Sequence, residues 1–183
     1  AQSLVGDRDP VARLLTATRA NTAESTVRTE GRWAVSRVQQ FQRDGVRLDD
    51  VDTARLLVAI RAIPIRDQVW LGMNRGNAVS HVALWTDMTK RAPDEVRTAP
   101  ASLLAFGSWL SGDGAMAWCA LDQVPEGKPY ALANLVAAAI ESGTHPREWE
   151  AAKSMPGHDV DLAAAPARIP SMHLGPVRPA HEL

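Results

Sequence analysis

The stretch "WLSGDGAMAWCALDQVP" (residues 109–125) decides the fold, because it shows how the chain turns between two apolar segments. A phosphate-binding glycine loop usually follows a strand, and no strand pattern precedes Gly112. A calcium loop needs acidic residues at alternating positions, whereas Asp113 has no acidic neighbour before Asp122. We therefore expect a helical hairpin in which Gly112 is the left-handed residue that ends one helix and Asp113 caps the next.

Helical spacing continues on the N-terminal side of this hairpin. Residues 24–44 repeat apolar or small residues at intervals of three and four, which predicts one amphipathic helix ended by Gly45. Asp9 and Pro10 are typical of a helix start, and "LDDVDTARLLVAIRAI" predicts a helix that Pro64 breaks. "RDQVWLGM" predicts a short helical turn, and "NAVSHVALWTDMTKR" predicts a further helix.

The prolines and apolar segments after residue 91 also favour helices. Pro93 and Pro100 are expected to interrupt the chain before "ASLLAFGSWL", and "YALANLVAAAIESG" has helical spacing again. Period-two strands and Asn-Gly hairpin turns are absent from the sequence. The fold class that we predict is all-α.

The character of the sequence changes near residue 154. We expect an α-helical domain over residues 1–153, followed by an extended or disordered tail over residues 154–183 that contains proline and histidine. The tail is expected to be a simple extension, with a partner-recognition segment as the alternative. The sequence does not start with Met, so we expect a processed product or a fragment of a longer protein.

Composition limits the function classes. The formal net charge of −1 lacks the basic excess that is usual for a dedicated duplex-DNA binder. One cysteine, Cys119, excludes an intramolecular disulfide framework and favours a cytoplasmic setting. Its apolar neighbours predict a buried, inert thiol. No apolar run is long enough to span a membrane, and charges interrupt the start of the sequence, so we expect neither a membrane span nor a signal peptide in it.

The motifs of familiar enzymes are missing, so we predict no catalytic residues, no cofactor and no metal site. His145 and Glu148 share a spacing of three, but without further ligands nearby we expect a solvated helix start. The run from His158 to Asp161 holds three potential ligands in a tail where adventitious binding is the expected outcome. His81 is expected to be a core histidine or to flank the core.

The hairpin resembles parts of tetratricopeptide repeats. In "SGDGAMAWCALDQVP" followed by "YALANLVAAAIESG", a Gly turn separates two helices, Ala-Leu closes the second and a Pro follows. The segment from Asp113 to Ala120 is about one helical turn too short for a standard unit. Because about one and a half units are visible and an array needs about three, we expect a repeat-like helical bundle.

A longer run, "RDQVWLGM…HVALWTDMTKRAP…APASLLAFGSWLSGDGAMAWCALDQVPEGKPYALANLVAAAIESGTHPREW", resembles the C-terminal half of an actinobacterial family called domain of unknown function 4192. The resemblance covers residues 50–150 and extends more loosely over residues 1–50. It supports the helical fold and implies no catalytic residues. Family members carry a further region before this one, which agrees with the expected fragment. The matching positions are Arg66, Asp67, Trp70, Leu84, Trp85, Pro93, Pro100, Leu104, Trp109, Gly112, Asp113, Gly114, Ala117, Ala120, Leu121, Tyr130, Leu132, Ala133 and Trp149.

Two functions remain as main hypotheses. A third is that the protein is an enzyme whose missing N-terminal half carries the chemistry. The favoured one is a non-catalytic protein–protein interaction or adaptor module, because the six Trp residues outnumber Phe and Tyr together. Its anchors would be Arg66, Trp70, Trp85 and Trp109, placed near a groove between helices. The binding partner would be an unknown protein, and homo-oligomerisation is also left open.

The alternative is a nucleic-acid-associated accessory protein. Residues 1–47 hold eight arginines and five acidic residues, and Arg28, Arg32 and Arg43 of the helix over residues 24–44 would form the contact. This hypothesis requires the three arginines to share one exposed face of that helix. We expect it to be the weaker one, since the basic excess is small.

Overall fold

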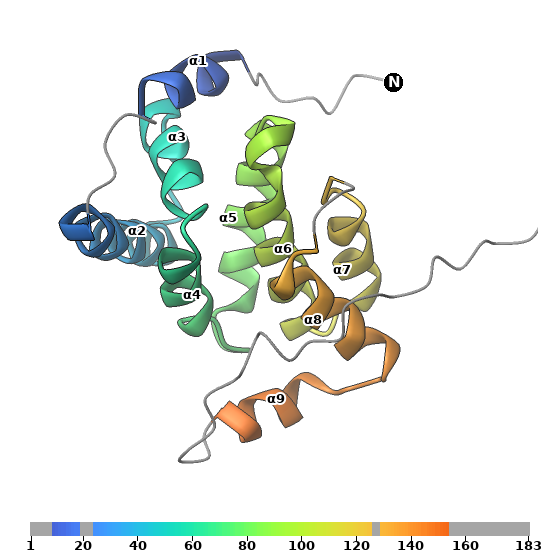
Figure 1. Cartoon of the computed structure of the whole chain (residues 1–183). Helices are drawn as coiled ribbons and strands as arrows, with labels where there is room; N and C mark the ends of the chain where they lie inside the picture. The colour runs from blue at the N-terminus through green and yellow to red at the C-terminus, as the bar shows by residue number, and fades with distance from the viewer. Residues whose placement is uncertain (1–8, 19–23, 126–128, 154–183) are drawn as a thin grey trace, which may run out of the picture.

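A computed structural model describes residues 9–18, 24–125 and 129–153, and every regular element in these ranges is a helix (Figure 1). The all-α prediction is therefore confirmed. The expected tail over residues 154–183, including the run from His158 to Asp161, lies outside the described residues. The helices are α1 (Asp9–Thr18), α2 (Glu24–Asp44), α3 (Asp50–Ala59), α4 (Ile63–Leu71), α5 (Ala78–Arg91), α6 (Asp94–Leu110), α7 (Gly114–Leu121), α8 (Ala131–Glu141) and α9 (Pro146–Lys153).

Helix α6 is the centre of the bundle. All residues of α6 from Ala99 to Leu110 are buried, so the helix is covered on every side. It packs against α3 and α5 on one side and against α7 and α8 on the other, as Figure 1 shows. Small residues permit the close approach: a Cβ atom on Gly107 would lie 3.2 Å from Met73 Cε and 3.4 Å from Val82 Cγ2. The core is therefore built around one helix.

The opening stretch is a helical hairpin, as predicted. Helix α6 ends at Leu110, and Gly112 has a φ of 87°. The backbone N–H of Asp113 donates to Ser108 O and that of Gly112 donates to Trp109 O, which is the hydrogen-bond pattern of a Schellman motif. The Asp113 carboxylate then accepts from the N–H of Met116 at 2.8 Å and caps α7.

Helix α2 also has its predicted bounds. It runs from Glu24 to Asp44, and Gly45 follows with a φ of 66°. One side of α2, formed by Gly31, Ala34 and Val38, is buried against the bundle. A Cβ atom on Gly31 would lie 2.8 Å from Gln68 Oε1, so this glycine allows α4 to approach α2 closely. The opposite side of α2 remains exposed.

A buried arginine joins the end of α5 to the connection between α2 and α3. Nη1 of Arg91 donates to the carbonyl of Leu48 and to Asp87 Oδ2, both at 2.9 Å, and Nη2 donates to Asp50 Oδ1 at 2.5 Å. Because the guanidinium is buried, these partners replace the water that it would otherwise bind. Arg91 thus attaches the end of α5 to residues 48–50, where the chain enters α3.

Three local predictions were wrong. Pro64 does not end α3, which already ends at Ala59; it lies in the first turn of α4, where proline is favoured. Pro100 lies inside α6, where burial of the turns that follow outweighs the cost of the missing N–H. Cys119 is exposed: α7 is apolar on all sides, but its buried residues are Ala117 and Ala120, and Cys119 lies on the outer side.

The hairpin predicts different effects of alanine at two neighbouring glycines. A Cβ atom added to Gly112 or to Gly114 would meet open space, so the two sites differ mainly in backbone conformation. We expect Gly112→Ala to lower the free energy of unfolding by about 1 kcal/mol through its positive φ. Gly114→Ala, in the first turn of α7, should be neutral or stabilising. Urea unfolding followed by circular dichroism measures both, and equal effects would contradict the hairpin geometry.

Candidate functional site

A pocket of about 340 Å³ lies between α6, α8 and α9. This volume is at the lower end of the range that is typical of ligand sites. We call it the aromatic pocket, because its lining includes one phenylalanine and two tryptophans. Its lining residues are Phe106 and Trp109 of α6, Leu135, Val136, Ala138 and Ala139 of α8, Ser142 and Thr144 of the next turn, and Trp149 of α9.

Four aromatic rings, three of which line this pocket, make one cluster. Trp149 of α9 lies with its ring centroid 5.5 Å from Trp70, 5.6 Å from Phe106 and 6.4 Å from Trp109. The contacts are tilted or edge-to-face, which are favourable arrangements for aromatic pairs. The cluster joins three helices, because Trp70 comes from α4 and Phe106 and Trp109 come from α6.

The turn that ends α8 places α9 beside α6. Gly143 has a φ of 67°, its N–H donates to Ile140 O, and the N–H of Thr144 donates to Ala139 O. This is a second Schellman motif, and it turns the chain so that Trp149 of α9 meets Phe106 and Trp109 of α6. The indole Nε1 of Trp109 donates to the carbonyl of Thr144 at 3.3 Å and attaches the turn to α6.

Three of the polar residues of the aromatic pocket, Ser142, Thr144 and Trp109, already have hydrogen-bond partners. The hydroxyls of Ser142 and Thr144 lie 2.7 Å apart, and Ser142 Oγ also donates to Ala139 O at 3.2 Å. The indole N–H of Trp109 is engaged with the Thr144 carbonyl. What the pocket offers to a ligand is therefore an apolar surface, without a charged group in its lining.

Arg66, one of the predicted anchors, is buried. Its Nε and Nη2 donate to Asp67 Oδ1, and its guanidinium lies over the ring of Tyr130, 4.9 Å from the centroid. Burial by itself lowers the pKa of Arg66, but hydrogen bonding to Tyr130 and the pair with Asp67 outweigh it, so the pKa lies above its ordinary value. Burial also raises the pKa of Tyr130. Arg66 joins α4 to the start of α8 and does not line the pocket.

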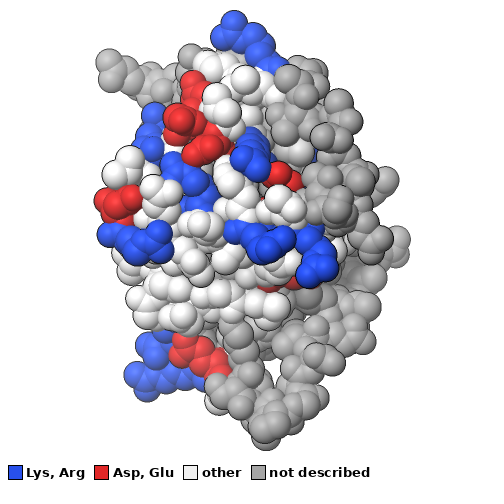
Figure 2. Space-filling view, turned by 90° about the vertical axis from the view of Figure 1, so that its left-hand side faces the viewer, with Lys and Arg blue, Asp and Glu red and all other residues white. Residues whose placement is uncertain are grey.

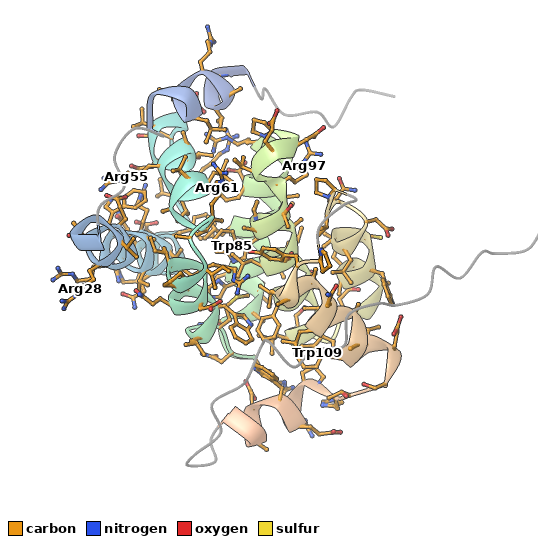
Figure 3. All side chains as sticks on the ribbon, viewed as in Figure 1. Arg28, Arg55, Arg61, Trp85, Arg97 and Trp109 are labelled. Carbon is orange, nitrogen blue, oxygen red and sulfur yellow. The ribbon has the colours of Figure 1, made fainter. Side chains whose placement is uncertain are left out.

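The four predicted anchors therefore have different positions. Trp109 lines the aromatic pocket, and Trp70 contacts two of its other lining residues, Phe106 and Trp149. Trp85 is fully buried in the middle of the bundle, away from the pocket, as Figure 3 shows. Its burial leaves Trp85 no surface to present to a partner, and the same is true of Arg66. Sequence reasoning missed Phe106, Leu135 and Trp149, and the "EW" that follows the glycine turn was the available signal for Trp149.

The three predicted arginines share one face of α2. With about 100° per residue, Arg28, Arg32 and Arg43 fall within an arc of about 60°, and all three are exposed. None of them forms an ion pair with a described residue. Figure 3 shows Arg28 pointing away from the bundle, and Figure 2 shows basic side chains in a row across that side of the molecule.

The acidic side chains between α2 and α3 are already engaged. Glu30 pairs with Arg55 at 2.7 Å, and Asp52 pairs with Arg37 at 2.6 Å. Asp44 follows Arg43 directly but lies about 100° further round the helix. We call Arg28, Arg32 and Arg43 the arginine stripe.

A second pocket, of about 170 Å³, lies beside the arginine stripe between α2, α4 and the start of α5. We call it the amide pocket, because four of its side chains are carboxamides and its lining contains no charged residue. The lining residues are Val35, Val38, Gln39 and Gln42 of α2, Gln68, Val69 and Gly72 at α4, and Asn77 and His81 at α5.

His81 is the buried polar residue of the amide pocket. The indole N–H of Trp85 donates to Nδ1 of His81 at 3.2 Å, so Nδ1 carries a lone pair. The neutral ring then holds its proton on Nε2, which lies 2.6 Å from the side-chain amide of Gln42. The amide must present its oxygen to accept that proton. Burial lowers the pKa of His81 to about 4.

The buried histidine predicts a pH dependence of stability. The unfolded chain binds a proton at His81 below a pKa of about 6.5, whereas the folded protein binds it only near pH 4. Stability from this residue is therefore complete above pH 6.5 and is lost as the pH falls toward 4. Between pH 7 and pH 5 we expect a loss of about 2 kcal/mol. Urea unfolding should show this loss in the wild type and in the His145→Gln control. Persistence of the full loss in His81→Gln would contradict the assignment.

The described residues offer neither a metal cluster nor a membrane span. No three His, Cys, Asp or Glu residues in these ranges are grouped so that they could hold a metal ion. His145 instead accepts from the N–H of Arg147 at the start of α9. None of the described helices combines the length and the apolar character that a membrane span requires.

Comparison with known proteins assigns the family. No curated protein and no solved structure matches the chain. The family model described as domain of unknown function (DUF4192) matches residues 2–147, which include all of α1 to α8 and both pockets apart from Trp149. The match covers most of the chain and extends well beyond the segment of closest resemblance, so the protein belongs to the DUF4192 family.

Proposed function

We propose that this protein is a non-catalytic interaction module that binds a protein partner in the aromatic pocket between α6, α8 and α9. The observation that carries the proposal is the pocket of about 340 Å³, whose lining is largely apolar and contains no charged residue, and in which Ser142, Thr144 and Trp109 are already hydrogen-bonded. Such a site gains free energy from an apolar group and very little from a polar or charged one.

The partner group that fits this chemistry is an aliphatic or aromatic side chain on an amphipathic helix or an extended segment. Interfaces of this kind place one or two large apolar side chains in a pocket, and tryptophan is enriched among the residues that contribute most. Trp109 and Trp149 supply that surface here. The tetratricopeptide-like hairpins would act as the scaffold that holds α6, α8 and α9 in place.

We propose further that the protein acts in the cytoplasm of an actinobacterium. This proposal is supported by the resemblance in residues 50–150 and by the single cysteine, which allows no disulfide within the chain.

The test is a charge placed in the wall of the aromatic pocket. Ala138 of α8 lines the pocket and is partly exposed, so Ala138→Glu should put a carboxylate against the apolar surface without unfolding the protein. Ala115→Glu on the exposed side of α7 is the matched control. We expect Ala138→Glu to weaken partner binding at least about tenfold, because the carboxylate must lose water when the partner docks.

The measurement is a tagged pull-down from host lysate with nuclease added, quantified by mass spectrometry, followed by calorimetric titration of the partner so identified. A protein that is retained by the wild type and by Ala115→Glu but lost with Ala138→Glu supports the proposal. If every recovered protein binds Ala138→Glu as well as the wild type, the pocket is not the binding site. Circular dichroism confirms that both variants are folded.

A second candidate function is nucleic-acid binding through the arginine stripe. The specific observation in its favour is that Arg28, Arg32 and Arg43 are exposed on one face of α2 while neighbouring acidic residues pair with other arginines. Three cations on one face can contact phosphates, and the resulting affinity would fall steeply with salt. The net charge of −1 makes this the second choice.

A further inference from the structure

The amide pocket contains hydrogen-bonding groups that the fold does not use. Gln42 is engaged with His81, and the Asn77 amide donates to Gly72 O at 3.0 Å. The side-chain amides of Gln39 and Gln68 make no hydrogen bond to a described residue. Each carries a donor and an acceptor side by side, while the valines of α2 and α4 form an apolar wall. The pocket can therefore recognise a small neutral group with adjacent donor and acceptor atoms.

The arginine stripe passes directly along this pocket. Arg32, Val35, Gln39 and Arg43 follow one another at intervals of three, four and four residues, so they lie on one side of α2. Val35 and Gln39 line the pocket, and an arginine lies about one turn beyond them at each end. The two arginine Cα atoms are separated by about 16 Å along the helix axis. A neutral pocket is thus flanked by two cations.

We propose that the amide pocket binds one base of a single-stranded nucleic acid whose phosphates contact Arg32 and Arg43. The proposal deepens the second candidate function and rests on it. The edges of nucleobases carry adjacent donors and acceptors, and a glutamine amide can bond to adenine in a bidentate manner. The aliphatic wall accommodates the face of the ring, and the phosphates remain outside with the arginines.

The geometry favours a strand over a free nucleotide or a duplex. Phosphates of one strand follow at about 3.4 Å along the axis of a duplex, so a separation of about 16 Å corresponds to several nucleotides. A mononucleotide cannot contact both arginines while its base fills the pocket. A base enters the pocket only when it is free of its partner, which excludes an intact duplex. The neutral His81 ring adds no charge that would hold a phosphate inside.

The experiment measures fluorescence anisotropy of labelled adenine and thymine oligodeoxynucleotides of about 12 residues with the full chain, at salt concentrations between about 50 and 200 mM. For the double variant Arg32→Gln, Arg43→Gln we expect at least about tenfold weaker binding and a log–log salt slope that is smaller by about 2. Arg61→Gln removes the same kind of exposed charge from the turn between α3 and α4 and should change neither quantity.

The contribution of the amide pocket is tested separately by Gln39→Leu, which removes an exposed amide at similar volume. We expect the salt slope to stay unchanged while the ratio of affinities for the adenine and thymine strands shifts by about fivefold or more. An unchanged ratio would overturn the base pocket, even if the arginine stripe still binds the strands.

Three other results would also overturn the proposal. They are the absence of an anisotropy change at about 100 μM protein in about 50 mM salt, equal weakening by Arg61→Gln, and competition by a mononucleotide that matches that of a strand. None of these results depends on Ala138, so failure here leaves the proposed protein-binding pocket untouched.

Discussion

The burial of α6 on every side is the constraint on which the rest of the structure depends. A helix without an exposed face needs neighbours all round, and α3, α5, α7 and α8 supply them. Where the neighbours approach closely, α6 has small residues such as Gly107, and where space remains it has Phe106 and Trp109. These two aromatic residues lie in its last two turns and also form a wall of the aromatic pocket. The core and the candidate protein-binding site therefore share residues of one helix, α6.

Helix α2 has the opposite arrangement, since the bundle covers one of its sides and the other faces water. Gly31, Ala34 and Val38 bury the inner side, while Arg28, Arg32 and Arg43 occupy the outer side. The outer side is consequently free of packing constraints, and its residues can change without loss of the core. The two candidate sites thus differ in kind. The aromatic pocket is built largely from core residues, whereas the arginine stripe lies on the exposed side of α2, with the amide pocket next to it.

The sequence predicted those elements whose signals are local. The hairpin at Gly112 and the bounds of α2 follow from glycine positions, capping and helical spacing, and each of these acts over a few residues. Pro100 and Cys119 were misassigned because burial by distant segments decides their environment. The same limit applies to the tryptophans. Trp85 and Trp109 have similar helical neighbours in the sequence, and only the position of α9 distinguishes the pocket wall from the core.

The exposure of Cys119 has a practical consequence. It is the one cysteine in the chain, and it lies on the outer side of α7, a helix that packs against both α6 and α8. A thiol-reactive fluorophore would therefore attach at a single point without any engineered residue. From that point the fluorophore would report in real time on movement of α8, which forms one wall of the aromatic pocket, in a protein of unchanged sequence.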